Sequence, residues 1–450
     1  MAADHRVAAP APAILDRGIR RWDLVAVAIN SIIGAGIFGL PSKVYALTGT
    51  YSLLGFLAGT LLTVLMVLCF AEVSSRFEET GGVYLYAREA LGPIVGFEIG
   101  WLMWLRMLTS FAAICNLLVT YLAMFWPPAG SGLGRTAAIV GVTGALALVN
   151  VRGVRQTALV SNLFTAGKLI PLLAFVGIGM FFVQPKNYSL GGPPSLDAAS
   201  SSLLLLMFAF GGFESAAVPA GEIRDPRRNL PFAMLTAVAA VSLLYMLIQF
   251  VCIGTLPHLA GSERPLADAA GNFLGPSGAS LIALGALIST TGALSVGVLA
   301  APRILFALAQ ERQLPRFLSV THHRFHTPHA AILVSSGLML IVTLSGTFIA
   351  AVRMSTIIRL MTYIVTCIAL LVLRRRRGGR SALFLVPMGA AVSLFTLGVC
   401  LWILSKGTWA EARDVGIAAA AGLLIFGFQL QQQRAVRPVR AAGPSPRNGT

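Results

Sequence analysis

Long apolar stretches recur along the chain. A scan for stretches of about 20 predominantly apolar residues, the length that a helix needs to cross a bilayer, gives twelve candidate spans. Only 11% of the 450 residues are charged and 56% are hydrophobic, which excludes an ordinary water-soluble domain. The sequence therefore predicts an all-α integral membrane protein of about twelve transmembrane helices. The spans fall near residues 24–46, 51–75, 93–125, 136–150, 157–183, 200–222, 232–256, 274–309, 329–347, 352–373, 382–404 and 413–431.

Two of these spans are interrupted by glycines near their middle. Residues 28–41 read AINSIIGAGIFGLP, and residues 207–219 read MFAFGGFESAAVP. Glycine is a poor helix former, and unwound backbone inside a bilayer is tolerated only where it lines a cavity or binds something. Such breaks at matching positions in two halves of a chain indicate a transporter binding site. The residues predicted to break the helices are Gly34, Gly36, Gly39, Gly211 and Gly212.

Each interrupted span opens a set of five spans. Because five is an odd number, the second set must insert in the opposite sense, so spans 1–5 and 6–10 are predicted to form two inverted five-helix repeats, followed by two extra helices. The expected division is a disordered tail over 1–20, a single transmembrane domain over 21–431 (repeat 1 near 24–183, repeat 2 near 200–373, extra helices near 382–431) and a basic disordered tail over 432–450.

Positive charge is distributed unevenly between the loops. With the N-terminus inside, the segments on the cytoplasmic side hold many more lysines and arginines than those outside, which predicts that both termini are cytoplasmic. The net charge of +17 is thereby explained by topology, and no nucleic-acid partner is expected. The outside segments hold only Lys43, Arg135, Lys186, Arg264, Arg353, Lys406 and Arg413.

Neither the cysteines nor the histidines indicate a metal site. The five cysteines lie in apolar stretches without CxxC spacing, so they are interpreted as small core residues. Four histidines cluster between residues 322 and 329, but no cysteine or carboxylate accompanies them, which favours a solvated basic loop. No metal is expected.

Several motifs resemble those of the amino acid–polyamine–organocation (APC) transporters. Residues 34–41 (GAGIFGLP) resemble the GxGIFxxP signature of that family, and residues 70–77 (FAEVSSRF) with 81–92 (GGVYLYAREALG) resemble its loop between spans 2 and 3. Residues 222–231 (EIRDPRRNLP) and 302–309 (PRILFALA) are similar to its patterns after span 6 and at the end of span 8. The resemblance implies a LeuT-like fold and secondary transport of amino acids or related amines.

The resemblance also implies roles for residues at the two breaks. Backbone N–H groups around Ala35 and Gly36 would hold the substrate carboxylate, in agreement with the positive end of a half-helix dipole at that point. Carbonyl groups of Ile32, Phe208 and Gly211 would meet the amino group, and Phe208 matches an aromatic gate of the family's arginine/agmatine antiporters. The substrate-binding residues expected at the breaks are Ile32, Ala35, Gly36, Ile37, Phe208 and Gly211.

Charged residues at membrane depth are further candidates. Lys168 resembles the span 5 lysine of proton-dependent APC members, and a desolvated lysine can take up and release a proton; alternatively it ties span 5 to span 1 carbonyls or snorkels to the surface. Glu214 could carry a proton, meet a cationic substrate or be fixed by the unwound segment. Arg106 would disfavour cationic substrates if it faced the cavity, whereas an ion pair with Glu214 would cancel that preference. Arg359, in span 10, receives no interpretation.

These observations predict a proton-coupled amino acid permease that works by alternating access, with no cofactor and the proton as coupling ion. An exchanger in which Lys168 is structural is the alternative among transporters. A membrane-embedded enzyme lacks a nucleophile–base pair or a metal set at membrane depth, and a channel would be recognised by ohmic current. The expected partners are an amino acid or related amine and the lipid bilayer of a cell (inner) membrane. The oligomeric state stays open.

Overall fold

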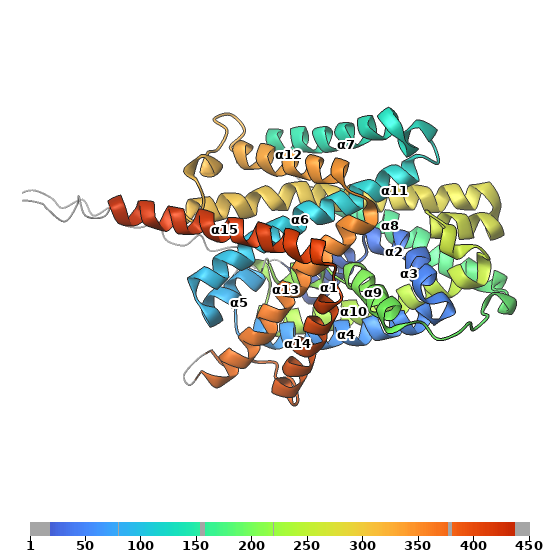
Figure 1. The fold of residues 1–450 in the computed structure, drawn as a ribbon, viewed down its shortest axis with the longest axis horizontal. Coiled ribbons are helices and arrows are strands. Elements are labelled where there is room, and N and C mark those ends of the chain that lie inside the picture. Colours follow the sequence, from blue (N-terminus) through green and yellow to red (C-terminus); the bar gives the residue numbers. More distant parts are fainter. Residues whose placement is uncertain (1–18, 80, 154–157, 219, 377–379, 437–450) are drawn as a thin grey trace, which may run out of the picture.

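The computed structural model describes residues 19–436 except 80, 154–157, 219 and 377–379, and most of these residues lie in helices (Figure 1). Within them the only β contact is an isolated bridge between Ile19 and Ile223. In the described part of the chain, ten helices are long and apolar enough to cross a membrane, and two apolar helices of 17 residues add to them. The protein is therefore a multi-pass helical membrane protein, as the sequence predicted.

Each predicted span coincides with one or more helices. The first half contains α1 (Arg21–Ile32), α2 (Ala35–Gly39), α3 (Pro41–Thr48), α4 (Ser52–Ser74), α5 (Gly82–Leu91), α6 (Pro93–Leu122), α7 (Gly132–Arg152) and α8 (Ala158–Gly179). The rest contains α9 (Leu196–Ala209), α10 (Pro226–Thr255), α11 (Pro265–Gln310), α12 (His329–Ser345), α13 (Phe348–Arg375), α14 (Gly389–Ser405) and α15 (Trp409–Val436). Short 3-10 helices are η1 (Gly49–Tyr51), η2 (Pro127–Gly130), η3 (Met180–Phe182), η4 (Pro185–Asn187), η5 (Phe213–Ala217), η6 (Ala220–Glu222), η7 (Leu259–Gly261) and η8 (Arg316–Ser319).

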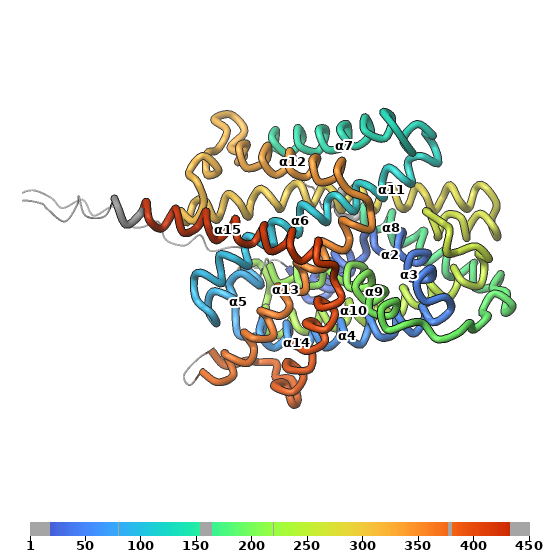
Figure 2. Tube along the Cα trace, in the orientation of Figure 1, coloured from blue at the N-terminus to red at the C-terminus, as the bar shows by residue number. Residues whose placement is uncertain are grey.

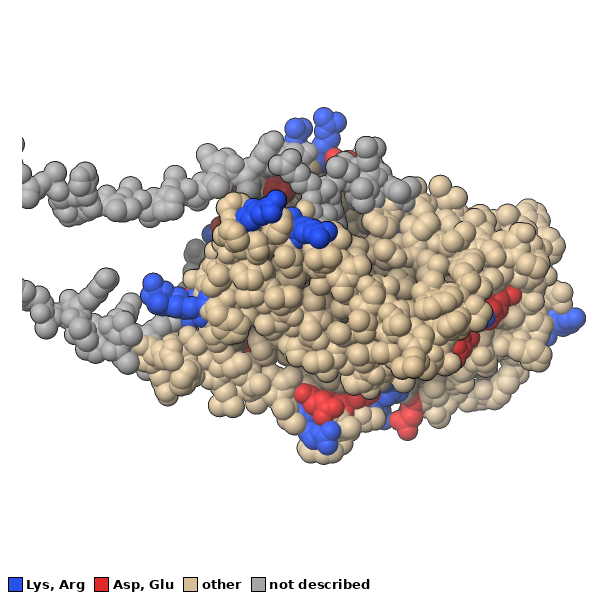
Figure 3. Space-filling model, turned by 90° about the horizontal axis from the view of Figure 1, so that it is seen from above, with Lys and Arg blue, Asp and Glu red and all other residues tan. Residues whose placement is uncertain are grey.

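The surface is apolar where a bilayer would cover it. Because lipid offers no hydrogen-bond partners, a spanning segment must satisfy its backbone groups internally, as these helices do. In Figure 3 the broad middle of the visible face is free of Lys, Arg, Asp and Glu, and most of the charged side chains lie toward the borders. In Figure 1 the helices α7, α12, α11 and α6 run side by side along the long axis.

Both predicted helix breaks are present. At the first, α1 ends at Ile32, and Ile33 and Gly34 adopt extended backbone angles before α2 begins. At the second, α9 ends at Ala209, and Gly212 adopts a φ of 121° before η5. Figure 2 shows α2 beside α9 near the centre of the molecule. The two interruptions therefore meet in the interior.

Gly36 and Gly39 correct one detail of the prediction. Both lie within α2 and not at the interruption. Their lack of a side chain instead permits close packing, since a Cβ atom on Gly36 would lie 2.6 Å from the Cα atom of Ala209 and one on Gly39 would lie 2.7 Å from Cζ of Phe348. Sequence alone could not separate a glycine that breaks a helix from one that lets a helix approach its neighbour.

A matching turn marks the same place in both halves. The sequence Leu-Gly-Pro occurs at 91–93, between α5 and α6, and again at 274–276, inside the 46-residue α11. Gly92 has a φ of 94° and Gly275 a φ of 68°, a region that favours glycine. In each half a short helix therefore turns at glycine into the long third span.

A buried carboxylate joins the extra helices to the repeats. Glu72, at the end of α4, is fully buried. Arg374 of α13 donates hydrogen bonds from Nε and Nη2 to its two oxygens at 2.6 and 2.5 Å, and the N–H of Val386, which precedes α14, donates at 2.9 Å. One side chain thus holds α4, α13 and the entry to α14 together.

We predict that Glu72→Ala lowers the free energy of unfolding by about 3–5 kcal/mol, because it leaves the Arg374 guanidinium without its buried partner. Denaturant unfolding of the purified protein in detergent measures this. The control is Glu79→Ala, at an exposed pair with Arg380 (2.5 Å), whose guanidinium holds the pKa of Glu79 below its usual range. We expect Glu79→Ala to lower the free energy of unfolding by about 1 kcal/mol or less. Equal losses in the two variants would contradict the prediction.

Candidate functional site

A cavity of about 210 Å³ lies where the two interrupted helices meet. Its wall combines backbone of the first break over residues 30–36, residues 208, 211 and 212 of the second break, and side chains of α6, α8, α11 and α13. Sites for drug-sized ligands measure about 300–1,000 Å³, so this cavity suits a small molecule. Both unwound segments therefore border the same cavity, the condition under which irregular backbone is tolerated at membrane depth.

Most of the residues expected at the site line this cavity. Ile37 is buried in the apolar core and does not line it, and Glu214 lies behind two arginines that do. Gly39 lies outside the wall. The expected residues that line it are Ile32, Gly34, Ala35, Gly36, Arg106, Lys168, Phe208, Gly211 and Gly212.

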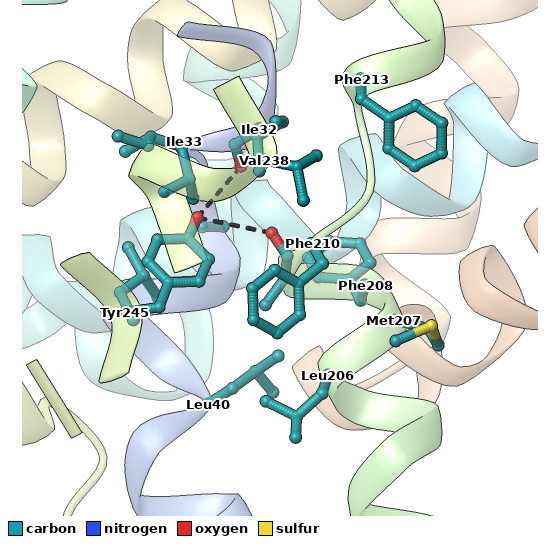
Figure 4. Close-up of a cluster of buried hydrophobic side chains, with 14 of the residues drawn as sticks. Ile32, Ile33, Leu40, Leu206, Met207, Phe208, Phe210, Phe213, Val238 and Tyr245 are labelled. Atoms are coloured by element: carbon teal, nitrogen blue, oxygen red, sulfur yellow. Dashed lines mark hydrogen bonds between the residues drawn. The ribbon is translucent and has the colours of Figure 1, made fainter. Parts of the chain in front are cut away.

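Tyr245 of α10 bridges the two broken helices. Its hydroxyl oxygen lies 3.2 Å from the carbonyl oxygen of Ile32 and 3.4 Å from that of Ala209, the last residues of α1 and α9 (Figure 4). The side chain is fully buried. A hydroxyl that donates to either helix end satisfies a carbonyl left over by the break. Sequence reasoning missed Tyr245, because a tyrosine in an apolar span gives no distinctive signal.

Lys168 caps the carbonyl end of α1. Its Nζ atom donates hydrogen bonds to the carbonyl oxygens of Asn30 at 3.2 Å and Ile33 at 3.0 Å, and the residue is 3% exposed. The C-terminal end of a helix carries partial negative charge, so a cation is favourable there. Lys168 thus points inward to span 1 and not toward the surface. Among the described residues, no carboxylate lies within ion-pair distance of it.

Glu214 is shared between two arginines. Its Oε1 atom lies 3.6 Å from Nη1 of Arg106 and 3.6 Å from Nε of Arg359. Its Oε2 atom accepts hydrogen bonds from the N–H of Gly212 at 2.9 Å and from the hydroxyl of Tyr363 at 3.1 Å. Both possibilities raised for Arg106 are therefore realised, since it faces the cavity and also pairs with Glu214. Because Arg359 shares that carboxylate, the pairing leaves positive charge uncompensated.

Arg359 caps the carbonyl end of α9. Its Nη1 atom donates to the carbonyl oxygens of Met207 at 3.3 Å and Phe208 at 3.4 Å, and its guanidinium carbon lies 5.9 Å from the centre of the Phe208 ring. The guanidinium fills the space that a side chain at Gly211 would need. A charged residue at membrane depth indicates a functional role, so Arg359 could have been singled out from the sequence. One sequence does not show which way the helix faces, so the contacts of its side chain could not be predicted.

The cavity is closed on one side of the breaks. Gly36 packs on Ala209, and the hydroxyl of Tyr121 donates to the carbonyl oxygen of Phe38 at 2.8 Å. Beyond the level of the breaks the wall continues on the opposite side along Asn30, Phe164 and Val296, toward the beginnings of α1 and α8 and the end of α11. The packing is therefore tight on the side of α2 and α9, whereas the cavity continues on the side of Phe164 and Val296.

A small cavity between two broken helices of a multi-pass helical protein is the place where membrane transporters bind their substrates. Comparison with known families is consistent with this class. A family model described as amino acid permease matches residues 19–423. The chain belongs to this family, a branch of the APC superfamily, and the resemblance inferred from its motifs is confirmed.

Curated relatives are similar over nearly their whole length. The methylthioribose transporter of Bacillus subtilis (strain 168) is 28% identical over 92% of this chain and 93% of its own. The serine/threonine exchanger SteT of the same organism is 28% identical over 88% of this chain and 92% of its own. An uncharacterised transporter of Mycobacterium bovis is 28% identical over 96% of this chain and 97% of its own.

We predict that Gly211→Ala lowers uptake from a mixture of labelled amino acids about 10-fold or more, because the new methyl group displaces the Arg359 guanidinium from the α9 carbonyls and each charged hydrogen bond is worth about 1.5–3 kcal/mol. Uptake is measured in proteoliposomes. The control is Gly337→Ala in α12, where a Cβ atom meets nothing within 4 Å. Normal uptake by Gly211→Ala would show that the position of Arg359 is unimportant.

Proposed function

We propose that the protein is a secondary active transporter that takes up an amino acid or related amine by alternating access, with a proton as the coupling ion and no other cofactor. The observation that carries the proposal is the cavity bounded by both helix breaks, with Lys168 bonded to the first of them. Membership of the amino acid permease family supports the substrate class.

The substrate would use the backbone groups that the breaks release. The N–H groups of Ala35 and Gly36, at the start of α2, have no intrahelical acceptor and line the cavity, so they suit the substrate carboxylate. Gly211 also lines the cavity, and its carbonyl group would accept from an amino group. That of Ile32 accepts from Tyr245 and would serve as a second-bond acceptor. That of Phe208 already accepts from both Arg359 and the N–H of Gly211, so an amino group could bind there only by displacing one of them.

Alternating access would exchange the closed side of the cavity for the open one. The contact of α2 on α9 would open, and the side lined by Phe164 and Val296 would close around the substrate. The Gly36–Ala209 contact is between backbone and small side-chain atoms, so its separation breaks only van der Waals contacts. The residues that cap α1 and α9 would move with those helices.

Lys168 would couple the proton to this movement. When its ammonium loses a proton, two charge-assisted hydrogen bonds to α1 become weaker neutral ones, so the hold of α8 on the broken helix loosens. Protonation from one side and release on the other would therefore bias the two states of the cavity.

We expect an inward proton gradient to drive accumulation of at least one amino acid by the purified protein in liposomes. Lys168→Met should abolish the effect of the gradient, because it removes the proton-binding amine at nearly constant volume. The control is Lys186→Met, at an exposed position in η4. Accumulation that still follows the gradient in Lys168→Met would refute the assigned role of this lysine.

An exchanger is the second candidate. The relative SteT is a serine/threonine exchanger, and the bonds from Lys168 to α1 also suit a permanent structural tie. In that case uptake ignores the gradient and requires amino acid inside the liposomes. The same assay, with empty and preloaded liposomes, separates the two candidates.

We further propose that both termini are cytoplasmic and that the protein lies in the cell (inner) membrane, from the distribution of positive charge. Lys186→Cys, between α8 and α9, should react with a membrane-impermeant maleimide in intact cells, whereas Arg316→Cys, between α11 and α12, should react only after permeabilisation. The five native cysteines are buried and give little background. The reverse labelling pattern would show that both termini lie outside the cell, contrary to the proposal.

A further inference from the structure

The charges around the cavity do not balance. Three cations line it, Arg106, Lys168 and Arg359, and they are 7%, 3% and 4% exposed. Among the described residues, Glu214 is the carboxylate within ion-pair distance of any of them. Two positive charges are therefore uncompensated in a region shielded from water, where an unpaired charge is costly.

We propose that this cavity selects an amino acid with an acidic side chain, and that the side-chain carboxylate binds between Arg106 and Arg359. The inference rests on the proposed function as an amino acid transporter and narrows its substrate class. A zwitterion with a neutral side chain leaves the charge excess unchanged, whereas an acidic amino acid brings one additional negative charge into the site.

Unpaired hydrogen-bond donors of the two arginines also support an acidic substrate. Arg106 lines the cavity, yet its guanidinium makes no hydrogen bond with the residues that the structure describes, and its ion pair with Glu214 is long at 3.6 Å. The Nε atom of Arg359 is likewise buried without a hydrogen-bond partner. Guanidinium groups offer planar forks of N–H donors that match a carboxylate. The Oε1 atom of Glu214, 3.6 Å from each guanidinium, also has no hydrogen-bond partner, and this single atom cannot satisfy both groups. A carboxylate from outside the protein would supply the acceptor that the two arginines lack.

A cationic side chain finds no comparable partner. The Oε2 atom of Glu214 accepts from Gly212 and Tyr363, and its Oε1 atom, which has no hydrogen bond, lies between the two arginines. A substrate cation at Oε1 would have to displace one of those guanidinium groups. Arg359 also occupies the carbonyl end of α9, where a second ammonium could otherwise bind. Glu214 is thus a positioning residue that holds two arginines at the cavity, and it does not serve as a receptor for substrate cations.

The test compares acids with their near-isosteric amides, which differ by one charge. The purified protein in liposomes is assayed for uptake of labelled aspartate and glutamate, with asparagine, glutamine, arginine, succinate and glutarate as competitors. We expect aspartate or glutamate to be preferred over its own amide by about 10- to 100-fold, as for charged hydrogen bonds. Arginine should not compete.

Variants of Arg106 test whether the preference for the acid over its amide arises at this arginine. Arg106→Gln should remove most of the acid-over-amide preference, and Arg106→Lys should restore part of it. The control is Arg303→Gln, which removes the same charge from an exposed position on α11, outside the cavity wall, and should keep the preference. The acid-to-amide ratio of the unmodified protein tests the proposal even if Arg106→Gln does not fold.

The outcomes distinguish this inference from the function on which it rests. Amides that compete as well as their acids, in a protein that transports neutral amino acids, would overturn the acidic selectivity and leave the permease intact. Equal competition by succinate and glutarate, or no transport of any amino acid, would overturn the proposed function itself. An unchanged preference in Arg106→Gln would show that the receptor is elsewhere.

Discussion

The site depends on one interaction that occurs twice, a cation that caps the carbonyl end of a broken helix. In the first half Lys168, on the fifth span, bonds to the last turn of α1, and in the second half Arg359, on the tenth span, bonds to the last turn of α9. Breaking a helix in a bilayer frees carbonyl groups that lipid cannot satisfy. The two caps satisfy freed carbonyl groups, which stabilises the breaks and positions the cavity between them.

The two caps occupy matching positions in the two repeats that the sequence predicts. Both occur at the fifth helix of their repeat, just as both Leu-Gly-Pro turns precede the third. The two halves differ in the identity of the cation, and this difference divides the roles. Lys168 has no carboxylate partner among the described residues and is the group proposed to exchange a proton, whereas Arg359 shares Glu214 with Arg106.

The sequence predicted the spans and the breaks because both depend on local properties, namely apolar length and glycine content. It could not predict which way a helix faces, so Arg106 had two interpretations and Arg359 none. Tyr245 and the packing of Gly36 on Ala209 depend on how helices distant in sequence approach one another. The proposed roles of Ala35, Gly36 and Gly211 come from a family resemblance and await the transport assays.

The uncompensated charge of the cavity has an electrical consequence. A membrane potential acts on every charge that crosses part of the bilayer, with an energy of about 2.3 kcal/mol per elementary charge per 100 mV for a full crossing. The empty site carries two excess positive charges, and an acidic amino acid would leave one. If Lys168 stays protonated throughout, as in an exchanger, the vacant carrier would therefore be more voltage-sensitive than the loaded one. If Lys168 releases its proton with the substrate, the vacant site also carries one excess charge and the two halves of the cycle would respond alike.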